Sequence, residues 1–496
     1  MSTHSAGSAH HHHAGHDHMA GHDHMAHMAH AHAGHHVMVH APAADVAEAY
    51  RYAYEQAQPD PGAAVVLVEL EACEADWQIT AGRTARAWTF NGQVPGPVIE
   101  ARVGDVLEVR LTNHLTEPTT LHWHGVRLPA AMDGTDMVQH PVEPGTTFVY
   151  RIKLLDAGTF WYHSHSNEPV QVRRGMYGAL IVRGTDEPAL DRERVVVLSD
   201  ATVEPTGDLS SAANWEGRDG DVRLVNGVAE PELMIWGGQV ERWRVINASS
   251  ARYVKLSIGG RPFMALSTGG GLLEVPVQLR DALLVPGDRI DIAVGPFEPG
   301  ETVSLLSVPY DRGFGTGESE RFATLRVGPR ADSQAVIAER RRTITPLVDG
   351  PVTPTREVRL GERAGAHGEV DYLINETQHL RADTVVVGEL QVWDVVNTSG
   401  VDHPFHLHGF FFQVLERNGT APAFRSWEDT VNVPAGGRVR IAWLPDDRPG
   451  EWMYHCHILE HHAAGMMAHF RLVRAVSGHE SSHVSPHVQL HSEAAH

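Results

Sequence analysis

The sequence predicts an all-β protein made of three β-sandwiches in tandem. Three segments alternate apolar and polar residues, as strands with one buried face do, and each ends on an asparagine. A Pro/Gly turn and a second alternating segment follow each of them, while helical periodicity is almost absent. Strands that recur in the same order at a long period indicate three copies of one structural unit. The first segments are VLEVRLTN ending at Asn113, QVERWRVIN ending at Asn247 and ELQVWDVVN ending at Asn397, and the turns contain Pro144, Pro286 and Pro434.

The three units lie between two tails. A chain of 496 residues is long enough for three domains that each bury a core. We place the units at residues 45–185, 186–335 and 336–475. Residues 1–44 and 476–496 are rich in histidine and have almost nothing to bury, so both tails are predicted to be disordered.

Histidine is the outlier in the composition, with 36 residues, of which 15 lie in residues 1–40 and five in residues 477–496. The first tail contains GHDHMA twice in succession, from Gly15 and from Gly21, followed by HMAHAHAGHH. Imidazole and thioether groups together suit copper in either oxidation state, so we expect additional copper to bind to the tails. The alternative is a soluble tail that only responds to pH.

Charge and hydropathy exclude several kinds of partner. The 40 basic and 62 acidic residues give a net charge of −22, which argues against nucleic acid and mildly favours cations, metal ions included. No apolar run approaches the length that spans a bilayer, so no transmembrane segment is predicted. The opening MSTHSAGSAHHHHAGHDHM has no apolar core and no twin arginine, so no export signal is visible.

Four pairs of histidines, each separated by one residue, lie at equivalent places in the first and third units. They occur in LHWHG and FWYHSHS of the first unit and in HPFHLHG and YHCHILEH of the third. The second unit has VKLSIGG and SLLSVPY at these places, so it keeps the scaffold without the histidines. One pair is weak evidence, but four pairs confined to two of three similar units indicate metal ligands. The pairs are His122 and His124, His163 and His165, His406 and His408, and His455 and His457.

The alternation of side chains along a strand separates the ligands into two sites. In YHCHILEH, His455 and His457 share one face of the predicted strand, and Cys456 points to the other. His403 likewise lies at an odd offset from the pair that follows it. One short strand can therefore serve two sites, back to back.

The first of these sites is predicted to hold a blue copper. Two imidazoles, a thiolate and a weak thioether form a ligand set that exchanges single electrons with little rearrangement. The eight paired histidines form the second site, which is large enough for three copper ions. If Cys456 binds metal, Cys73, the only other cysteine, has no intrachain disulfide partner. The ligands predicted for the blue copper are His403, Cys456, His461 and Met466.

With these motifs the sequence resembles the multicopper oxidases, the family of laccases and bacterial copper-efflux oxidases. The four motifs match in order and spacing, including the ten residues from Cys456 to Met466, and the similarity extends over residues 60–475. The resemblance implies three cupredoxin-like Greek-key β-sandwich domains and four copper ions, one of type 1, one of type 2 and two of type 3. It also implies that Cys456 receives an electron at the type 1 copper and that its two neighbours carry it onward. The implied ligands are His403, Cys456, His461 and Met466 for type 1, His122 and His406 for type 2, His124, His163 and His457 for one type 3 copper, and His165, His408 and His455 for the other.

The resemblance also bears on which residues deliver protons and which lie near the electron donor. Asp133, in AAMDG, matches the carboxylate that the family uses for proton delivery near the type 2 copper, and the alternative is a turn-forming aspartate before Gly134. Relatives often carry a glutamate of the proton path at the place where this chain has His462, so the resemblance does not assign a relay residue there. Asp402 precedes the first type 1 histidine and is expected to be a solvated turn residue, or else a group that steers cations or accepts a phenolic proton.

The favoured function is an oxidase that couples one-electron oxidation of a small donor to four-electron reduction of dioxygen to water. The tails favour Cu(I) as the donor, with Fe(II) as a further metal-ion candidate. The third unit lacks the methionine-rich insert of copper-efflux oxidases, and this open approach to the type 1 site favours phenols or aromatic amines. A copper-binding and buffering protein in copper tolerance is a second class, although it needs no cysteine shared between two sites. A copper nitrite reductase-like enzyme is a further alternative, whose catalytic copper is mononuclear. The resemblance suggests a periplasmic or extracellular location, with the cytoplasm as the alternative.

Overall fold

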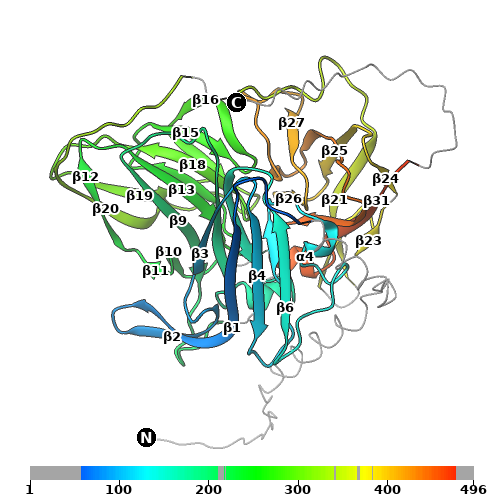
Figure 1. Cartoon of the computed structure of the whole chain (residues 1–496), viewed down its shortest axis with the longest axis horizontal. Helices are drawn as coiled ribbons and strands as arrows, with labels where there is room; N and C mark the ends of the chain where they lie inside the picture. Colours follow the sequence, from blue (N-terminus) through cyan, green and yellow to red (C-terminus); the bar gives the residue numbers. More distant parts are fainter. Residues whose placement is uncertain are drawn as a thin grey trace, which may run out of the picture. The chain divides into compact units, whose positions relative to one another are not determined.

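The computed structural model describes residues 57–210, 217, 219–339, 342–365, 369–382 and 384–475, and both predicted histidine-rich tails lie outside them. Nearly all the regular structure of the described residues is β-strand, arranged in six sheets (Figure 1). Each of the three predicted units holds two of these sheets, which confirms the prediction of an all-β fold.

The first unit (residues 65–183) holds two four-stranded sheets, with orders β2-β1-β4-β6 and β3-β8-β7-β5. β1 runs parallel to β4, and β4 runs antiparallel to β6. The strands are β1 (Val65–Thr80), β2 (Arg83–Phe90), β3 (Gly96–Arg102), β4 (Val106–Asn113), β5 (His122–His124), β6 (Thr147–Lys153), β7 (Gly158–His163) and β8 (Tyr177–Arg183).

The second unit (residues 192–330) holds a seven-stranded sheet, β11-β10-β9-β13-β18-β15-β16, and a five-stranded sheet, β12-β20-β19-β14-β17. Its strands are coloured green to yellow-green in Figure 1. They are β9 (Arg192–Ala201), β10 (Val222–Val225), β11 (Val228–Ala229), β12 (Glu232–Gly237), β13 (Glu241–Asn247), β14 (Val254–Ile258), β15 (Phe263–Thr268), β16 (Gly271–Leu279), β17 (Asp281–Leu284), β18 (Arg289–Val294), β19 (Thr302–Ser307) and β20 (Glu320–Arg330).

The third unit (residues 356–473) holds the sheets β22-β21-β25-β29-β27 and β23-β31-β30-β26-β28, and β24 also pairs with β31. The strands are β21 (Arg356–Ala364), β22 (Val370–Ile374), β23 (Leu380–Arg381), β24 (Val385–Val386), β25 (Gln391–Asn397), β26 (His403–Leu407), β27 (Phe412–Arg417), β28 (Thr430–Val433), β29 (Arg438–Trp443), β30 (Gly450–Cys456) and β31 (Met467–Val473).

One three-strand arrangement recurs in every unit, as β1-β4-β6, β9-β13-β18 and β21-β25-β29. In each, the middle strand is parallel to the first and antiparallel to the last. The middle strand ends on the predicted asparagine. Asn113 Nδ2 donates to the carbonyls of Glu117 at 2.8 Å and Val142 at 2.7 Å, and Asn247 and Asn397 make equivalent pairs of bonds. A buried amide that ties two loops together explains why asparagine recurs there.

The first and third units share one apolar core cluster. It includes Leu107 and Tyr150 of the first unit and Phe405 and Trp452 of the third. The second unit has a separate cluster that includes Trp243. Histidine rings of the two units also meet, because His124 of β5 stacks on His406 of β26.

Three short helical segments of the described residues lie near these strands. The 3₁₀ helix η1 (Ala130–Met132) contacts β30, and α3 (Glu168–Gln171) contacts α4 (Leu459–Ala463). None of the described helices has the length and apolar composition for a membrane crossing.

Candidate metal centres

The predicted blue-copper residues meet in the interior of the third unit. Cys456 ends β30, His403 begins β26, and His461 lies in α4. Cys456 Sγ lies 3.5 Å from His403 Nδ1 and 3.6 Å from His461 Nδ1, and the two nitrogens are 3.1 Å apart. Met466 is fully buried, and its main chain bonds to those of Cys456 and His461. A thiol and two imidazole nitrogens thus converge on one point.

The surroundings of this group favour a soft metal ion. Burial raises the pKa of Cys456 and lowers that of His403 to about 3, so without a cation the thiol stays protonated and the imidazole neutral. A bound metal ion deprotonates such a thiol. Ser399 Oγ is hydrogen-bonded to His403 Nε2 at 2.8 Å, and the Tyr372 ring stacks on His461 with 3.9 Å between centroids. These contacts fix both rings with Nδ1 toward the sulfur.

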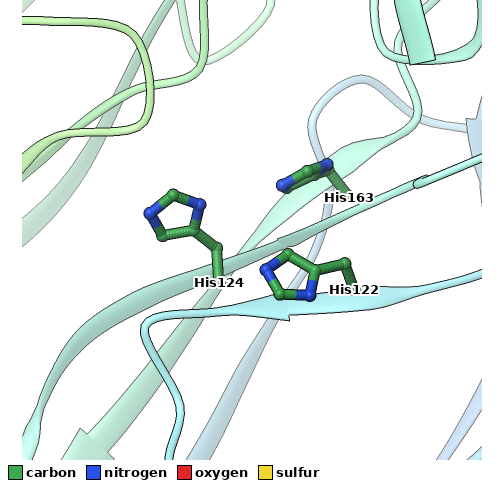
Figure 2. Close-up of side chains that lie close together, drawn as sticks. All are labelled: His122, His124 and His163. Carbon is green, nitrogen blue, oxygen red and sulfur yellow. The ribbon is translucent and has the colours of Figure 1, made fainter. Parts of the chain in front are cut away.

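The eight paired histidines form one buried cluster between the first and third units, with none more than 6% exposed. The register of the sheets aligns them, because His122 lies opposite His163 and His406 opposite His455. Figure 2 shows His122 and His124 side by side with His163 nearby. The rings of His124 and His406 stack at 3.8 Å between centroids, which joins the two units.

Hydrogen bonds decide which nitrogen of most of these rings faces the cluster. Backbone carbonyls accept from Nδ1 of four rings, at 2.7–2.9 Å. The Nε2 atoms of three of them, and that of His165, have no hydrogen-bond partner among the described residues. His124 is reversed, since its Nε2 bonds Asp429 Oδ1 at 3.1 Å and Thr430 Oγ1 at 3.2 Å, which leaves Nδ1 toward the cluster. The carbonyl-bonded rings are those of His122, His163, His406 and His455.

The inward nitrogens lie close together. His408 Nε2 is 3.0 Å from His455 Nε2, and His124 Nδ1 is 3.2 Å from His457 Nε2. Burial, assisted by the neighbouring imidazoles, holds the pKa values of His124 and His408 well below their usual range. Neutral imidazoles with unpartnered nitrogens facing one another are the donors that copper takes, so the cluster fits that metal.

Asp133 lies beside this cluster. Its backbone carbonyl accepts from His122 Nδ1 at 2.7 Å, and its Oδ2 accepts from His408 Nδ1 at 2.8 Å. Although burial alone would lower the pKa of His122, the Asp133 carboxylate raises it. The residue also follows η1 and donates its N–H to the carbonyl of Ala130, so it occupies a turn as well.

The structure adds residues that the sequence did not single out. Asp429 accepts from His124 through its side chain and from His406 through its backbone carbonyl. Glu168, three residues after His165, is buried and hydrogen-bonded to His462 Nδ1. The short spacing of Glu168 from the FWYHSHS histidines could have indicated that it lies near the cluster. Its partner could not be predicted, because His462 lies 294 residues away in the sequence.

The expectation that Asp402 is a solvated turn residue is wrong. Its side chain is 3% exposed and accepts from Tyr310 Oη at 2.6 Å, Asn432 Nδ2 at 2.7 Å and the N–H of Ala435 at 2.8 Å. Tyr310 belongs to the second unit, so a buried carboxylate joins the second and third units beside His403. The sequence around it, SGVD, is short and carries no local signal of these partners.

Comparisons with known proteins place the same residues in matched segments. Family models described as multicopper oxidase match residues 71–187 and 354–475. The chain is 29% identical to a multicopper oxidase of Mycobacterium tuberculosis, over 76% of this chain and 81% of that protein, and 27% identical to a laccase of Bacillus subtilis, over 77% and 89%. A solved structure titled as a multicopper oxidase from Campylobacter jejuni, a metallo-oxidase, matches with a TM-score of 0.74 and 29% identity, over 83% of this chain and 92% of that one.

Proposed function

We propose that this chain, which belongs to the multicopper oxidase family, couples one-electron oxidation of a small donor to reduction of dioxygen. Four donor molecules each lose one electron, and dioxygen takes up these electrons with four protons to give two water molecules. Bound copper would supply the reversible one-electron chemistry that no side chain of the protein offers. Family membership supports copper binding and oxidoreductase activity, and the four-electron reaction is our proposal.

One observation carries this proposal: a single strand supplies ligands to both sites. Cys456 faces His403 and His461, while the rings of His455 and His457 face the eight-histidine cluster. The backbone of three consecutive residues therefore connects a one-electron site to a site with room for several metal ions. A copper-storage protein needs no such connection.

We propose four copper ions, one of type 1, one of type 2 and a type 3 pair. The eight buried imidazoles support more than one ion in the cluster, because they exceed what one ion takes. The ligands we propose are His403, Cys456, His461 and Met466 for type 1, His122 and His406 for type 2, His124, His163 and His457 for one type 3 ion, and His165, His408 and His455 for the other.

Asp133 is proposed to deliver protons to the eight-histidine cluster. Its Oδ2 is bonded to His408, and its Oδ1 lies 3.4 Å from His122 Nδ1. A carboxyl group between two rings of the cluster can pass a proton to a group bound there without a large movement. The turn that Asp133 also occupies fixes it in this place.

The donor is proposed to approach from the second unit. An open cavity of about 840 Å³ is lined by residues that include Tyr253, Tyr310, Arg312 and Phe314. Tyr253 and Tyr310 stack with 5.9 Å between ring centroids, and Tyr310 bonds Asp402, the residue before His403. Aromatic walls support phenols or aromatic amines as donors. The five acidic residues of the same cavity are balanced by four arginines, so support for Cu(I) as a donor comes from the composition of the tails and not from this cavity.

The experiment that tests this function is oxygen uptake by the copper-loaded protein with Cu(I), Fe(II) and a substituted phenol side by side. We expect each donor that is oxidised to be consumed at four molecules per dioxygen, without hydrogen peroxide. Copper binding without oxygen uptake from any donor would favour the copper-buffering alternative. Reduction of nitrite in place of dioxygen would favour the nitrite reductase alternative.

A periplasmic or extracellular location and the capture of additional copper by the tails remain predictions. Family resemblance supports the first, and the composition of residues 1–40 supports the second. Cell fractionation tests the location directly.

A further inference from the structure

The second unit supplies none of the predicted copper ligands, yet its backbone lines the eight-histidine cluster. The turn between β17 and β18 reaches the rings at Gly287, which has a φ of +88°. A Cβ atom at this position would lie 2.9 Å from His457 Cδ2 and 3.0 Å from His124 Cε1. Only a glycine lets the chain pass this close to both rings.

Two residues later, Arg289 uses all its donors at this junction. It is fully buried, and its five N–H groups have five acceptors. Two of these acceptors are the carboxylate oxygens of Asp429, at 2.7 Å from Nη1 and 2.5 Å from Nη2. The other three are backbone carbonyls, those of Thr159 at 3.2 Å, Gly287 at 3.2 Å and Gly269 at 2.9 Å. These acceptors come from all three units.

Asp429 connects this arginine to one ring from each ligand-bearing unit. Its Oδ1 accepts from His124 Nε2 at 3.1 Å, and its backbone carbonyl accepts from His406 Nδ1 at 2.9 Å. Both carboxylate oxygens already bind Arg289, so Asp429 orients the two rings and is not itself a metal ligand. The Arg289 guanidinium also packs closely against the backbone next to His124. A Cβ at Gly125 would lie 2.3 Å from Arg289 Nη2.

We propose that Arg289 is a positioning residue, through which the ligand-free second unit sets the orientation of His124 and His406. Its guanidinium holds the Asp429 carboxylate in a two-point contact, which fixes the reversed His124 ring with Nδ1 inward. The inference rests on the proposed function only in requiring that the cluster bind copper. It gives a unit without proposed copper ligands a role at the site.

The test compares the copper-stripped full-length protein with its Arg289→Lys and Arg289→Gln variants. Each is titrated with copper against a competing chelator, and the loaded proteins are compared by electron paramagnetic resonance and visible absorption. Lysine keeps the positive charge but cannot hold a carboxylate at two points. We expect both variants to bind copper at the eight-histidine cluster about 10- to 100-fold more weakly. The type 2 resonance should change, while the blue absorption band stays as in the wild type.

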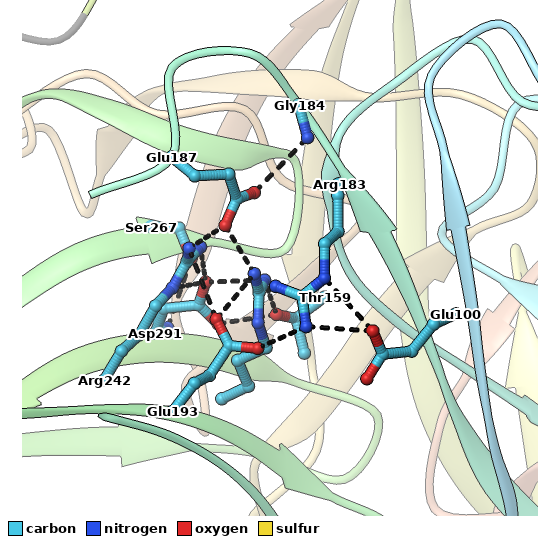
Figure 3. A network of polar contacts seen from close by, with 10 residues as sticks. Glu100, Thr159, Arg183, Gly184, Glu187, Glu193, Arg242, Ser267 and Asp291 are labelled. Atoms are coloured by element: carbon cyan, nitrogen blue, oxygen red, sulfur yellow. Dashed lines mark hydrogen bonds and ion pairs between the residues drawn. The ribbon is translucent and has the colours of Figure 1, made fainter. Parts of the chain in front are cut away.

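Arg244→Lys is the matched control. Arg244 is also a fully buried arginine of the second unit, on the strand next to that of Arg289, and it bonds Glu187 and Asp291 of the polar network shown in Figure 3. Its partners include Glu187 at 2.6 Å, Asp291 at 3.3 Å and the Thr159 hydroxyl at 3.1 Å. Thr159 is shared with Arg289, which bonds its backbone carbonyl, but Arg244 does not bond Asp429 in the described residues. The control should lose thermal stability and keep the copper affinity and the type 2 resonance of the wild type.

The inference is overturned if Arg289→Lys matches the wild type, or if Arg244→Lys changes copper affinity and resonance in the same way. If an Arg289 variant does not fold, Asp429→Asn tests the same Arg289–Asp429 ion pair by removing the charge of the carboxylate. An Asp429→Asn protein with wild-type affinity and resonance would also overturn it. A wild-type protein that takes up no copper at the cluster would refute the proposed function instead.

Discussion

At the scale of single residues, the partner of the outer ring nitrogen decides what each histidine offers to the cluster. His122 and His406 give Nδ1 to a backbone carbonyl and keep Nε2 inward. His124 gives Nε2 to Asp429 and keeps Nδ1 inward. The H-x-H spacing placed these rings on one face of a strand, but the inward atom depends on partners from other segments.

Replacing Cys456 by serine should remove the blue absorption and reduce oxidation of every donor to background. The thiolate is the only sulfur anion the group can form, and a serine hydroxyl does not replace it for copper. Visible absorption and oxygen uptake are the measurements. Cys73→Ser is the control, because Cys73 lies in the first sheet beside Thr89 and should leave both properties unchanged. A colourless Cys456→Ser protein with wild-type turnover would contradict the assignment.

Asp133→Asn should slow turnover of a phenol and of Cu(I) alike, by about 100-fold or more, if the carboxyl group transfers protons. Asparagine keeps the shape and can still meet His408, so the blue absorption should stay intact. Steady-state rates with both donors, measured with the absorption spectrum, check this. Wild-type turnover of both donors would show that another group delivers protons, and the Glu168–His462 pair would be tested next.

At the scale of strands, the asparagine that ends the middle strand of each unit has the same structural task in different surroundings. In the third unit, Asn397 accepts from the N–H of Ser399, and the Ser399 hydroxyl bonds His403. In the second unit, Asn247 accepts from the N–H of Ser249, and no copper ligand follows. The repeated element therefore supports a proposed metal ligand in one copy and only the fold in the other.

Asn397→Ala and Asn247→Ala should destabilise the protein by similar amounts, about 1–3 kcal/mol for each backbone carbonyl left without its donor. Only Asn397→Ala should also shift the blue absorption band, because it frees Ser399 beside His403. Chemical denaturation and visible absorption separate the two effects. An equal shift in both variants would show that the blue absorption band responds to a general loss of packing and not to the Ser399–His403 contact.

The strands and the convergence of the proposed ligands could be predicted because their signals are local. Alternation fixes the face of Cys456, and repetition fixes the place of the histidine pairs in two of three units. The residues that orient those ligands carry no local signal. Arg289 and Asp429 are 140 residues apart in sequence, and only the packing of the second unit against the third reveals their contact. Asp402 was misjudged for the same reason, since its partner Tyr310 lies 92 residues before it.

At the scale of the whole molecule, copper should stabilise the contact between the first and third units, because each supplies four histidines to the cluster. At a free copper concentration 100-fold above Kd, the gain in unfolding free energy is about 2.7 kcal/mol for one site. Thermal melts of the copper-stripped and copper-loaded protein measure it. His122→Ala serves as the control and should reduce the gain. An unchanged Tm at full copper occupancy would count against a site shared by two units.

Deleting residues 1–40 should weaken Cu(I) oxidation at low copper and leave phenol oxidation nearly unchanged. The deletion removes 15 imidazoles and no proposed ligand of the four coppers. Initial rates over a range of Cu(I) concentrations, beside rates with a phenol, are the measurement. A tail of equal length with glutamine in place of histidine is the matched control and should behave like the deletion. If both activities fell equally, the tail would serve folding or copper loading.

The strand that carries Cys456 has one more consequence, for how the protein can move. β30 is hydrogen-bonded on both sides, to β26 and to β31. An electron that passes between the sites on its two faces therefore follows covalent bonds within one sheet. No interdomain hinge lies along this route, so the tunnelling distance is fixed. Solvent viscosity, which slows the exchange of donors at the open cavity, should leave the internal electron-transfer rate constant unaltered.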